Sequence, residues 1–431
     1  MVFKPQHSWE FCSADDIEAR TIRALRNQVA HVREDSPHYA VALAHVDPRD
    51  IDSLESFSRL PLTEKNELAA SAASFTAVPP ESVAEIVVTS GSTGKPLLFP
   101  LTANDLDRLA FNEALSFNAA GIDCSDRVQI LVSLDRLFIA GMAYYRGLTL
   151  LGATTARVGV LPFPMQKHYL ELLKPTALVG VPSFLLKLAA ELERSGFDPA
   201  TAGIRTLVCI GETVRTRELE LNPVGQALTT RFGATVCSTY GATELSVAYG
   251  ECTHGCGGHS HPELVYTEIV DDEGHTLPDG EIGELVTTTL GVEGVPLVRY
   301  RTGDMTFAMT APCACGRNSC RIGPILGRKS QLIKLKGTTL YPTTVTNALD
   351  GIDGIEDYVL VLENDTSLSD RVTLHAATRP DNVPLIAQNL RTHARVAIPV
   401  LVSNIPTITA LRGEQRKKVR IVDRRLRLTP R

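Results

Sequence analysis

A polar, glycine-rich stretch in the first quarter of the chain has the residue types that bind phosphate. It reads VVTSGSTGKPLLFP over residues 87–100. Glycine lets a ligand approach the backbone, hydroxyl and N–H groups donate hydrogen bonds to phosphate oxygens, and lysine adds a positive charge. A Walker loop requires G-x-x-x-x-G-K-[ST], whereas here only two residues separate Gly91 from Gly94, and Pro96 follows Lys95. The stretch therefore predicts a different phosphate loop after a short strand, with a solvated turn as the alternative.

Thiols and imidazoles gather in two other segments, ECTHGCGGHSH and APCACGRNSC. The possible metal ligands in them are Cys252, Cys256, His259, His261, Cys313, Cys315 and Cys320. Two thiol-rich turns about 55 residues apart, each offering two ligands, suit a closed tetrahedral zinc site. The alternative is a set of reduced thiols in loops, without metal.

These side chains must be positioned by a core of strands and helices. A serine cap followed by spaced apolar residues predicts an amphipathic helix over 13–32. Short apolar runs at 127–133, 176–181 and 205–210 are typical of buried strands, and a helical stretch lies between two of them at 183–196. This alternation predicts an α/β domain around a largely parallel sheet.

The predicted secondary structure changes in the second half of the chain. From about residue 263, segments with Gly and Asp-Gly turns predict a β-rich subdomain. After residues 327–331 about 100 residues remain, a length that fits a small α+β domain. We therefore expect a large N-terminal domain over residues 1–328, made of α/β layers plus the β-rich subdomain, and a small C-terminal domain over 329–431.

Composition limits the possible environments and partners. The 431 residues are 44% hydrophobic and carry a net charge of −6, so the chain as a whole offers no electrostatic attraction to nucleic acid or anionic lipid. The sequence contains no apolar run of about 18 residues and does not start with a signal-peptide pattern. We expect a cytoplasmic protein without membrane segments, in which the nine cysteines are reduced or bind metal.

Three polar segments follow apolar runs in a fixed order: STYGATE (238–244), YRTGD (300–304) and GRKSQLIKLKG (327–337). Together with TSGSTGKP they resemble the core motifs of the adenylate-forming superfamily, which includes acyl-CoA synthetases and adenylation domains. Four further elements are similar to the phenylacetate-CoA ligase branch: PLTEKNEL (61–68), the Cys–His pair 252 and 259, CACGR (313–317) and VRIVDRR (419–425). The resemblance extends over nearly the whole chain.

The resemblance implies a reaction in two steps. A carboxylate attacks the α-phosphate of ATP to give an acyl-adenylate and pyrophosphate, and a thiol such as CoA then attacks the acyl carbon. The first step requires alignment and charge neutralisation more than covalent catalysis. The small C-terminal domain is expected to be mobile and to rotate between the two steps.

The resemblance also assigns residues to ATP. The β- and γ-phosphates would be held by the loop Ser90, Gly91, Ser92, Thr93, Gly94 and Lys95. Tyr240 and Gly241 would lie at the adenine, Thr243 would touch the α-phosphate, and Glu244 would supply the hard oxygen ligand that magnesium prefers. The remaining positions are Asp304 and Arg328 at the ribose, and Gly211 and Glu212 in the loop that lines the adenine and acyl pockets. For any single acidic residue, a helix cap or a surface ion pair is the alternative.

The same resemblance selects the zinc ligands Cys252, His259, Cys313 and Cys315. Four protein ligands leave no open position, so we expect a structural site. Cys256, His261 and Cys320 would be spare or alternative ligands.

The catalytic lysine of the C-terminal domain is expected at Lys417, six residues before Asp423. The segment LRGEQRKK departs from the pattern of the branch because Arg416 replaces a glycine, so Lys418 is an alternative, as is a solvated basic run. At the hinge, Ser330 and Gln331 stand where the family usually has aspartate.

The acid pocket is expected around residues 137–153, where the branch usually has smaller residues. Here the chain carries Tyr144, Tyr145 and Arg146, and Ala242 of the YGATE segment would complete the pocket. Bulk reduces the cavity, and a buried arginine requires a partner. This predicts an aryl or small polar acid and disfavours an unsubstituted arylacetate relative to a smaller or more polar acid, with an Arg146 that faces solvent as the alternative.

The leading prediction is thus an AMP-forming acid–thiol ligase that uses ATP, Mg²⁺ and a structural zinc, with CoA as the acceptor, and that could form a homodimer. Within the same chemistry, the acyl group could pass to an amine or a carrier protein. The alternative from another class is a catalytically inactive, zinc-stabilised nucleotide-binding protein.

Overall fold

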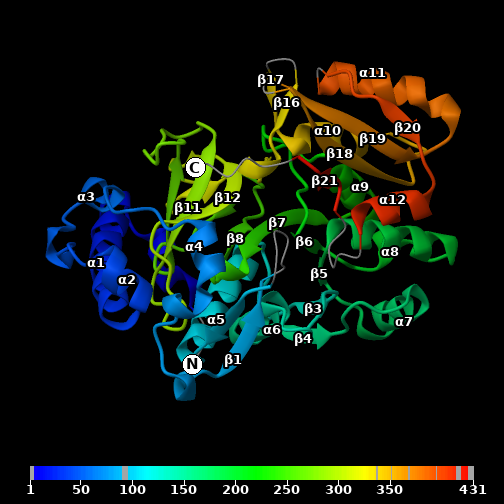
Figure 1. Cartoon of the computed structure of the whole chain (residues 1–431). Helices are drawn as coiled ribbons and strands as arrows, with labels where there is room; N and C mark the ends of the chain where they lie inside the picture. Colours follow the sequence, from blue (N-terminus) through cyan, green and yellow to red (C-terminus); the bar gives the residue numbers. More distant parts are fainter. Residues whose placement is uncertain are drawn as a thin grey trace. The chain divides into compact units, whose positions relative to one another are not determined.

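The computed structural model describes residues 4–89, 96–335, 338–350, 352–366, 369–394, 396–413 and 419–425 (Figure 1). The chain divides into two compact units. The first consists of residues 1–221, 225–302 and 306–324, and the second of 222–224, 303–305 and 325–431. The second unit thus begins slightly before the division expected from the sequence and takes in two short earlier segments.

A mixed sheet forms the centre of the first unit, in the strand order β13-β14-β9-β8-β7-β6-β5-β3-β4. Its parallel strands are β3 (Arg127–Ile130), β4 (Thr154–Arg157), β5 (Ala177–Gly180), β6 (Thr206–Ile210) and β7 (Thr235–Ala242). The antiparallel strands are β8 (Val247–Glu251), β9 (Gly258–His259), β13 (Ala308–Met309) and β14 (Arg321–Ile322). The predicted parallel core is confirmed, and the sheet changes direction after β7.

Helices precede and connect these strands. They are α5 (Ala103–Ala119), α6 (Ile139–Leu151), α7 (Phe163–Leu173), α8 (Pro182–Arg194) and α9 (Pro223–Phe232). Parallel neighbours require such crossover connections. Near the N-terminus lie α1 (Ala14–Asp35), α2 (Pro37–Ala42), α3 (Leu54–Ser58) and α4 (Lys65–Ala70).

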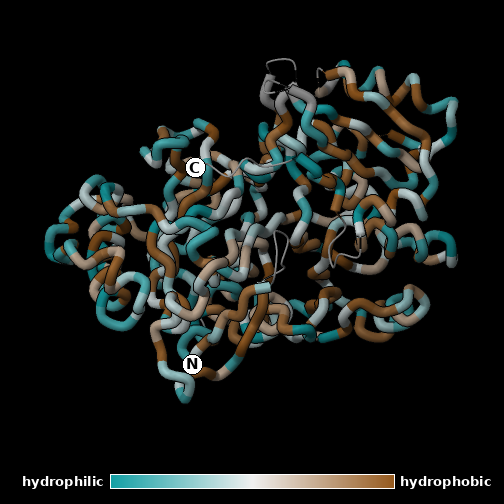
Figure 2. Tube along the Cα trace, viewed as in Figure 1, coloured by the Kyte–Doolittle hydropathy of each residue, from teal (hydrophilic) through white to brown (hydrophobic). Residues whose placement is uncertain are grey.

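Helix α1 confirms the expected amphipathic helix. The Ser13 side chain caps it by accepting a hydrogen bond from the Asp16 N–H. Hydrophilic and hydrophobic residues alternate along it (Figure 2), and Leu25, Val29 and Val32 are fully buried. This spacing turns one face of the helix toward the core.

Two further β structures belong to the first unit. The antiparallel pair β1 (Glu85–Val88) and β2 (Leu98–Leu101) flanks the predicted phosphate loop, whose residues 90–95 lie outside the described residues. The expected β-rich region contains β10 (Val265–Val270), β11 (Gly283–Thr289) and β12 (Tyr300–Thr306).

The second unit is the expected small α+β structure. Its main sheet has the order β20-β19-β18-β21, formed by β18 (Asp357–Thr366), β19 (Ser369–Ala377), β20 (Val400–Val402) and β21 (Ile421–Asp423). The other elements are β15 (Gly327–Arg328), β16 (Ile333–Leu335), β17 (Thr338–Leu340), α10 (Pro342–Asp350), α11 (Val383–His393) and α12 (Ile405–Arg412). Leu360, Leu374 and Ile386 are fully buried in its hydrophobic core.

No helix within the described part of the chain combines the length and the hydropathy that crossing a membrane requires.

Candidate functional site

The YGATE residues lie where the parallel part of the first sheet ends. Tyr240, Gly241 and Ala242 end β7, and Thr243 and Glu244 begin a single 3-10 turn that leads back into antiparallel β8. Ser246 closes the turn with a positive φ of 50°, a conformation that residues other than glycine rarely adopt. Ligands of open α/β sheets bind outside the carboxyl ends of the strands, which is where this turn lies.

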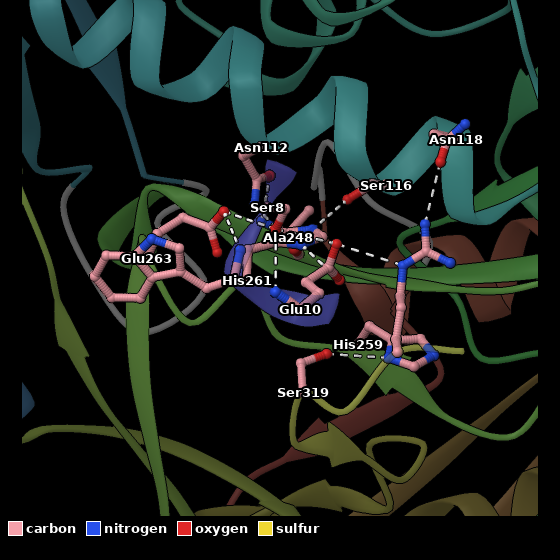
Figure 3. Close-up of polar contacts among 12 residues, drawn as sticks. Ser8, Glu10, Asn112, Ser116, Asn118, Ala248, His259, His261, Glu263 and Ser319 are labelled. Atoms are coloured by element: carbon pink, nitrogen blue, oxygen red, sulfur yellow. Dashed lines mark hydrogen bonds and ion pairs between the residues drawn. The ribbon is translucent and has the colours of Figure 1, made fainter. Parts of the chain in front are cut away.

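Helix α5 fixes this turn through buried polar side chains. Arg108 donates from Nη1 to the Ser246 carbonyl at 2.5 Å and from Nε to the Leu290 carbonyl at 2.7 Å. One helical turn later, Asn112 accepts from the Ala248 N–H at 2.9 Å and donates to the Ala248 carbonyl at 3.2 Å (Figure 3). Side chains of one helix therefore hold the backbone where the turn that carries Thr243 and Glu244 leads into β8.

Glu244 is buried next to a cation that the sequence motifs did not identify. Its Oε1 lies 3.7 Å from Nζ of Lys65, the first residue of α4. The segment PLTEKNEL around Lys65 served only as a family element in the sequence. The hydroxyl of Thr243 donates to the Val88 carbonyl at 3.5 Å, and Val88 ends β1, the strand that precedes residues 90–95. The turn that carries Thr243 and Glu244 is thus tied to the strand that leads into the predicted phosphate loop.

The Gly211–Glu212 loop follows β6, which pairs in parallel with β7 through Ile210 and Thr239. Gly211 has a φ of 75°, a value that glycine adopts without strain. The carboxylate of Glu212 accepts hydrogen bonds from the Ser183 N–H at 2.9 Å and from the Ser183 hydroxyl at 2.8 Å. The loop is therefore anchored to the start of α8 at the same end of the sheet as the YGATE turn.

Two predicted ribose contacts lie together in the second unit. Asp304 and Arg328 are paired across β12 and β15, and the Arg328 Nε lies 3.6 Å from the Asp304 Oδ1. Arg425 of the VRIVDRR segment donates to the carbonyls of Ser330 at 2.9 Å and Leu332 at 2.7 Å, which fixes the segment after Arg328. The predicted catalytic residue Lys417 and its alternative Lys418 lie outside the described residues.

The three predicted pocket residues on α6 have different surroundings. Tyr144 is buried and packs edge-on against Phe117, with ring centroids 5.7 Å apart. The Tyr145 ring lies under the guanidinium of Arg157 at 4.8 Å. Arg146 Nη2 donates to Asp107 Oδ1 of α5 at 2.5 Å, so the protein itself neutralises the charge of Arg146.

The two thiol-rich turns meet at the antiparallel edge of the large sheet. One ligand atom from each of Cys252, His259, Cys313 and Cys315 lies within 4.8 Å of the other three. The Cys252 and Cys313 sulfurs are 3.7 Å apart, and Cys315 Sγ lies 3.6 Å from the His259 Nε2. Cys252 directly follows β8 and His259 lies in β9, while the two remaining thiols come from the loop between β13 and β14. This arrangement could hold a metal ion.

A buried polar network surrounds this cluster. The other ring nitrogen of His259, Nδ1, lies 3.2 Å from the Ser319 hydroxyl (Figure 3). Arg317 donates from Nη1 to the Cys315 sulfur at 3.6 Å and pairs through Nε with the Glu10 carboxylate at 3.4 Å. Such outer contacts orient metal ligands.

His261 belongs to this outer network. Its Nε2 lies 2.9 Å from the Ser116 hydroxyl and its Nδ1 3.2 Å from the Glu10 carboxylate (Figure 3). The two other predicted spare ligands differ from each other. Cys256 Sγ lies 3.2 Å from the Cys313 sulfur, whereas Cys320 directs its thiol to the Arg321 carbonyl at 3.6 Å. Only Cys256 therefore borders the cluster.

The pKa values of the thiols differ. Burial raises the pKa of the Cys252 thiol. Burial also acts on Cys315, but contacts from His259 and Arg317 outweigh it and lower the pKa of this thiol below its ordinary value. Because the thiolate is the form that binds metal, the surroundings of Cys315 favour the metal-binding form more than those of Cys252 do.

The chain is similar to known proteins over most of its length. The family model described as AMP-binding enzyme matches residues 16–293. A phenylacetate-coenzyme A ligase of Thermus thermophilus is 32% identical over 378 residues, which cover 86% of this chain and 83% of that protein. One of Pseudomonas putida is 31% identical over 381 residues, which cover 86% and 84%.

A solved structure, 2-hydroxyisobutyryl-CoA ligase in complex with 2-HIB-AMP, has a TM-score of 0.85 to this chain at 22% identity and covers 98% of this chain and 92% of its own. At this identity the likeness shows a shared fold. The family match covers well over half of the chain, and the two ligases are similar over most of their length. The chain therefore belongs to the AMP-binding enzyme family and is an adenylate-forming acyl-CoA ligase.

Proposed function

We propose that this enzyme activates an aryl acid with ATP and passes the acyl group to CoA, using the turn Thr243–Glu244 at the end of β7. One observation carries the proposal: the sheet changes direction at this turn, and helix α5 holds the backbone where the turn leads into β8. In the first step a carboxylate oxygen attacks the α-phosphorus, and the bond to the β-phosphate breaks as pyrophosphate leaves. In the second step the CoA thiol attacks the acyl carbon, and AMP leaves.

The side chains would act by positioning and by charge. Tyr240 would stack on adenine, Asp304 would accept from the ribose hydroxyls, and Thr243 would contact the α-phosphate. Glu244 would hold Mg²⁺, because a buried carboxylate at the phosphates is the hard oxygen ligand that this ion prefers. Bound Mg²⁺ neutralises phosphate charge. Residues 90–95 would hold the outer phosphates, and Lys417 would meet the charge that develops at the α-phosphate.

An aryl acid is favoured over a small polar one. The polar alternative depended on the charge of Arg146, which the Asp107 carboxylate already neutralises. Tyr144 packs with Phe117, so α6 presents aromatic rather than charged side chains to the core at this position. The ligases similar to this chain are named for phenylacetate.

We further propose that Cys252, His259, Cys313 and Cys315 bind one structural zinc. In a tetrahedral site with Zn–S bonds of about 2.3 Å, sulfurs stand about 3.8 Å apart. The Cys252 and Cys313 sulfurs are 3.7 Å apart. Four protein ligands leave no position for a substrate.

ATP–pyrophosphate exchange across a panel of acids tests the function. We expect exchange with aryl acids, and thioester formation when CoA is added. Products with an amine or a carrier protein, but not with CoA, would favour the other acceptors. Absence of exchange with every acid would favour an inactive nucleotide-binding protein. In the same assay Lys417→Ala should abolish exchange while Lys418→Ala should not, because adjacent side chains point in different directions.

A further inference from the structure

The PLTEKNEL segment places a cation beside Glu244. The Lys65 ammonium lies 3.7 Å from the Glu244 carboxylate, and the Lys65 and Glu244 side chains are 32% and 12% exposed. A charge-assisted hydrogen bond is typically 2.7–2.9 Å long, so this contact is a loose ion pair. Among the described residues the ammonium makes no other ion pair or hydrogen bond. It is therefore accessible to an incoming ligand.

The backbone that carries Lys65 is firmly held, although its side chain is not. The Thr63 N–H donates to the Arg299 carbonyl at 2.9 Å, and the Thr63 carbonyl accepts from the Arg301 N–H at 3.0 Å. The Thr63 hydroxyl donates to the Val298 carbonyl at 2.6 Å. Glu64 pairs with Arg301 at 3.4 Å. A fixed backbone with a flexible four-carbon stem can keep a point charge close to a ligand that moves during a reaction.

The ion pair lies beside the turn to which the α-phosphate contact is assigned. Glu244 follows Thr243, whose hydroxyl contacts the carbonyl of Val88 at the end of β1. One residue, Thr89, separates Val88 from the phosphate loop at 90–95. The ammonium of Lys65 thus contacts Glu244, the neighbour of Thr243 in the turn that is tied to this strand.

We propose that Lys65 is a phosphate-binding cation of the adenylation step, which stabilises pyrophosphate as it leaves; this rests on the proposed function above. When the acid oxygen bonds to the α-phosphorus, the bond from phosphorus to the bridging oxygen breaks, and its electron pair stays on pyrophosphate. No proton moves to or from Lys65. Its ammonium neutralises the charge that the leaving group gains. In the absence of ligand, the Glu244 carboxylate holds the ammonium in place.

Binding of pyrophosphate without divalent metal separates this role from a structural one. Lys65→Gln should weaken the binding measured by calorimetry in EDTA roughly tenfold, the effect of losing one charged hydrogen bond. Glu244→Gln should strengthen it by about threefold or more, because a competing carboxylate is removed and Lys65 is released. The double variant should lose this gain, which a double-mutant cycle measures. A lysine that only orients Glu244 would leave metal-free binding unchanged.

The two half-reactions give a second measurement. Lys65→Gln should lower kcat/KM for ATP in acid-dependent exchange by on the order of thirtyfold. Thioester formation from supplied acyl-adenylate should stay within about twofold, because no pyrophosphate takes part in it. Lys65→Arg keeps the charge and should restore part of the exchange. Lys167→Gln is the matched control, since Lys167 pairs with Glu171 at 3.9 Å and its side chain is 29% exposed.

The outcomes separate the two proposals. If wild-type enzyme exchanges pyrophosphate and Lys65→Gln matches it in exchange and in pyrophosphate binding, the role of Lys65 is rejected while the proposed function stands. Equal losses in both half-reactions, or a lowered unfolding temperature, would make Lys65 a structural residue and reject the role too. If wild-type enzyme exchanges with no acid, the proposed function fails, and the role of Lys65 fails with it.

Discussion

The catalytic turn and the metal cluster are two polar regions of one unit that are built in opposite ways. At the turn, Lys65 is the one cation among the described residues that pairs with Glu244, at 3.7 Å, and the Lys65 and Glu244 side chains are 32% and 12% exposed. At the cluster, Glu10 and His261 are fully buried, and Glu10 pairs with both His261 and Arg317. The charged side chains at the turn would bind charged groups of the substrate and its metal ion. The charged side chains around the cluster pair with one another within the protein.

Helix α5 contacts both regions with residues that are four apart. Arg108 and Asn112 bind the backbone at the catalytic turn, whereas Ser116 contacts His261 beside the cluster. Residues at this spacing lie on one face of a helix. Near the end of the helix, from another face, Asn118 accepts a hydrogen bond from Arg317 at 3.2 Å. One buried polar face therefore supports both regions, the turn proposed to bind substrate transiently and the cluster proposed to bind zinc permanently.

The largest expected effect concerns the proposed zinc site. Cys313→Ser removes a buried thiol of the cluster, so zinc content should fall from about one per chain to near zero. Because metal binding is coupled to folding, the free energy of unfolding should drop by on the order of 5 kcal/mol. Metal analysis and denaturant unfolding measure both. Cys124→Ser, which changes an exposed thiol, is the control, and an unchanged Cys313→Ser protein would contradict the zinc assignment.

The next effect concerns the turn that carries Thr243 and Glu244. Glu244→Gln removes the charge proposed to hold Mg²⁺ and should depress acid-dependent pyrophosphate exchange by on the order of a hundredfold. The unfolding temperature should change little, because the carboxylate has one loose partner. A wild-type exchange rate in Glu244→Gln would reject the assignment of the YGATE turn.

The sequence could predict the motifs but not the framework that holds them. The parallel strands followed from apolar runs, and the four predicted zinc ligands lie within 4.8 Å of one another. Arg108 and Asn112 look like ordinary polar helix residues, because nothing local shows that strand β8 will cover them. Glu10 contacts Arg317 across most of the chain length, and no local pattern encodes such a contact. Side chains that bind ligands recur in short motifs, whereas their supports depend on tertiary packing.

The third effect concerns the buried network around the metal cluster and what it contributes to stability and to activity. Glu10→Gln leaves Arg317 without its buried carboxylate partner and should lower the free energy of unfolding by about 2 kcal/mol. Pyrophosphate exchange at a temperature well below unfolding should stay within about twofold, since no substrate contact is lost. Glu34→Gln changes an exposed side chain and is the control. A larger loss of exchange than of stability would mean that the cluster also supports the catalytic turn.

The smallest effect concerns the contact of α5 with α6. Glu113 of α5 is buried, and no described residue gives its carboxylate a hydrogen bond or an ion pair. Burial raises the pKa of Glu113 from its ordinary 4.5 to about 8. Gly147 of α6 packs so closely that a Cβ there would come within 2.3 Å of the Glu113 Cβ. This face of α5 therefore contrasts with the face toward β8, where Arg108 and Asn112 have hydrogen-bond partners.

The sign of the pH dependence follows from the raised pKa. Between about pH 4.5 and 8 the native state keeps the Glu113 proton and the unfolded state does not, so unfolding releases a proton. The contribution of Glu113 to the free energy of unfolding is then full below about pH 4.5 and falls by about 1.4 kcal/mol per unit as pH rises toward 8. Glu113→Gln should remove this slope, which unfolding midpoints at pH 6 and 7 measure against wild type. Parallel pH profiles of the two proteins would show that Glu113 is already ionised in the native state and has a partner.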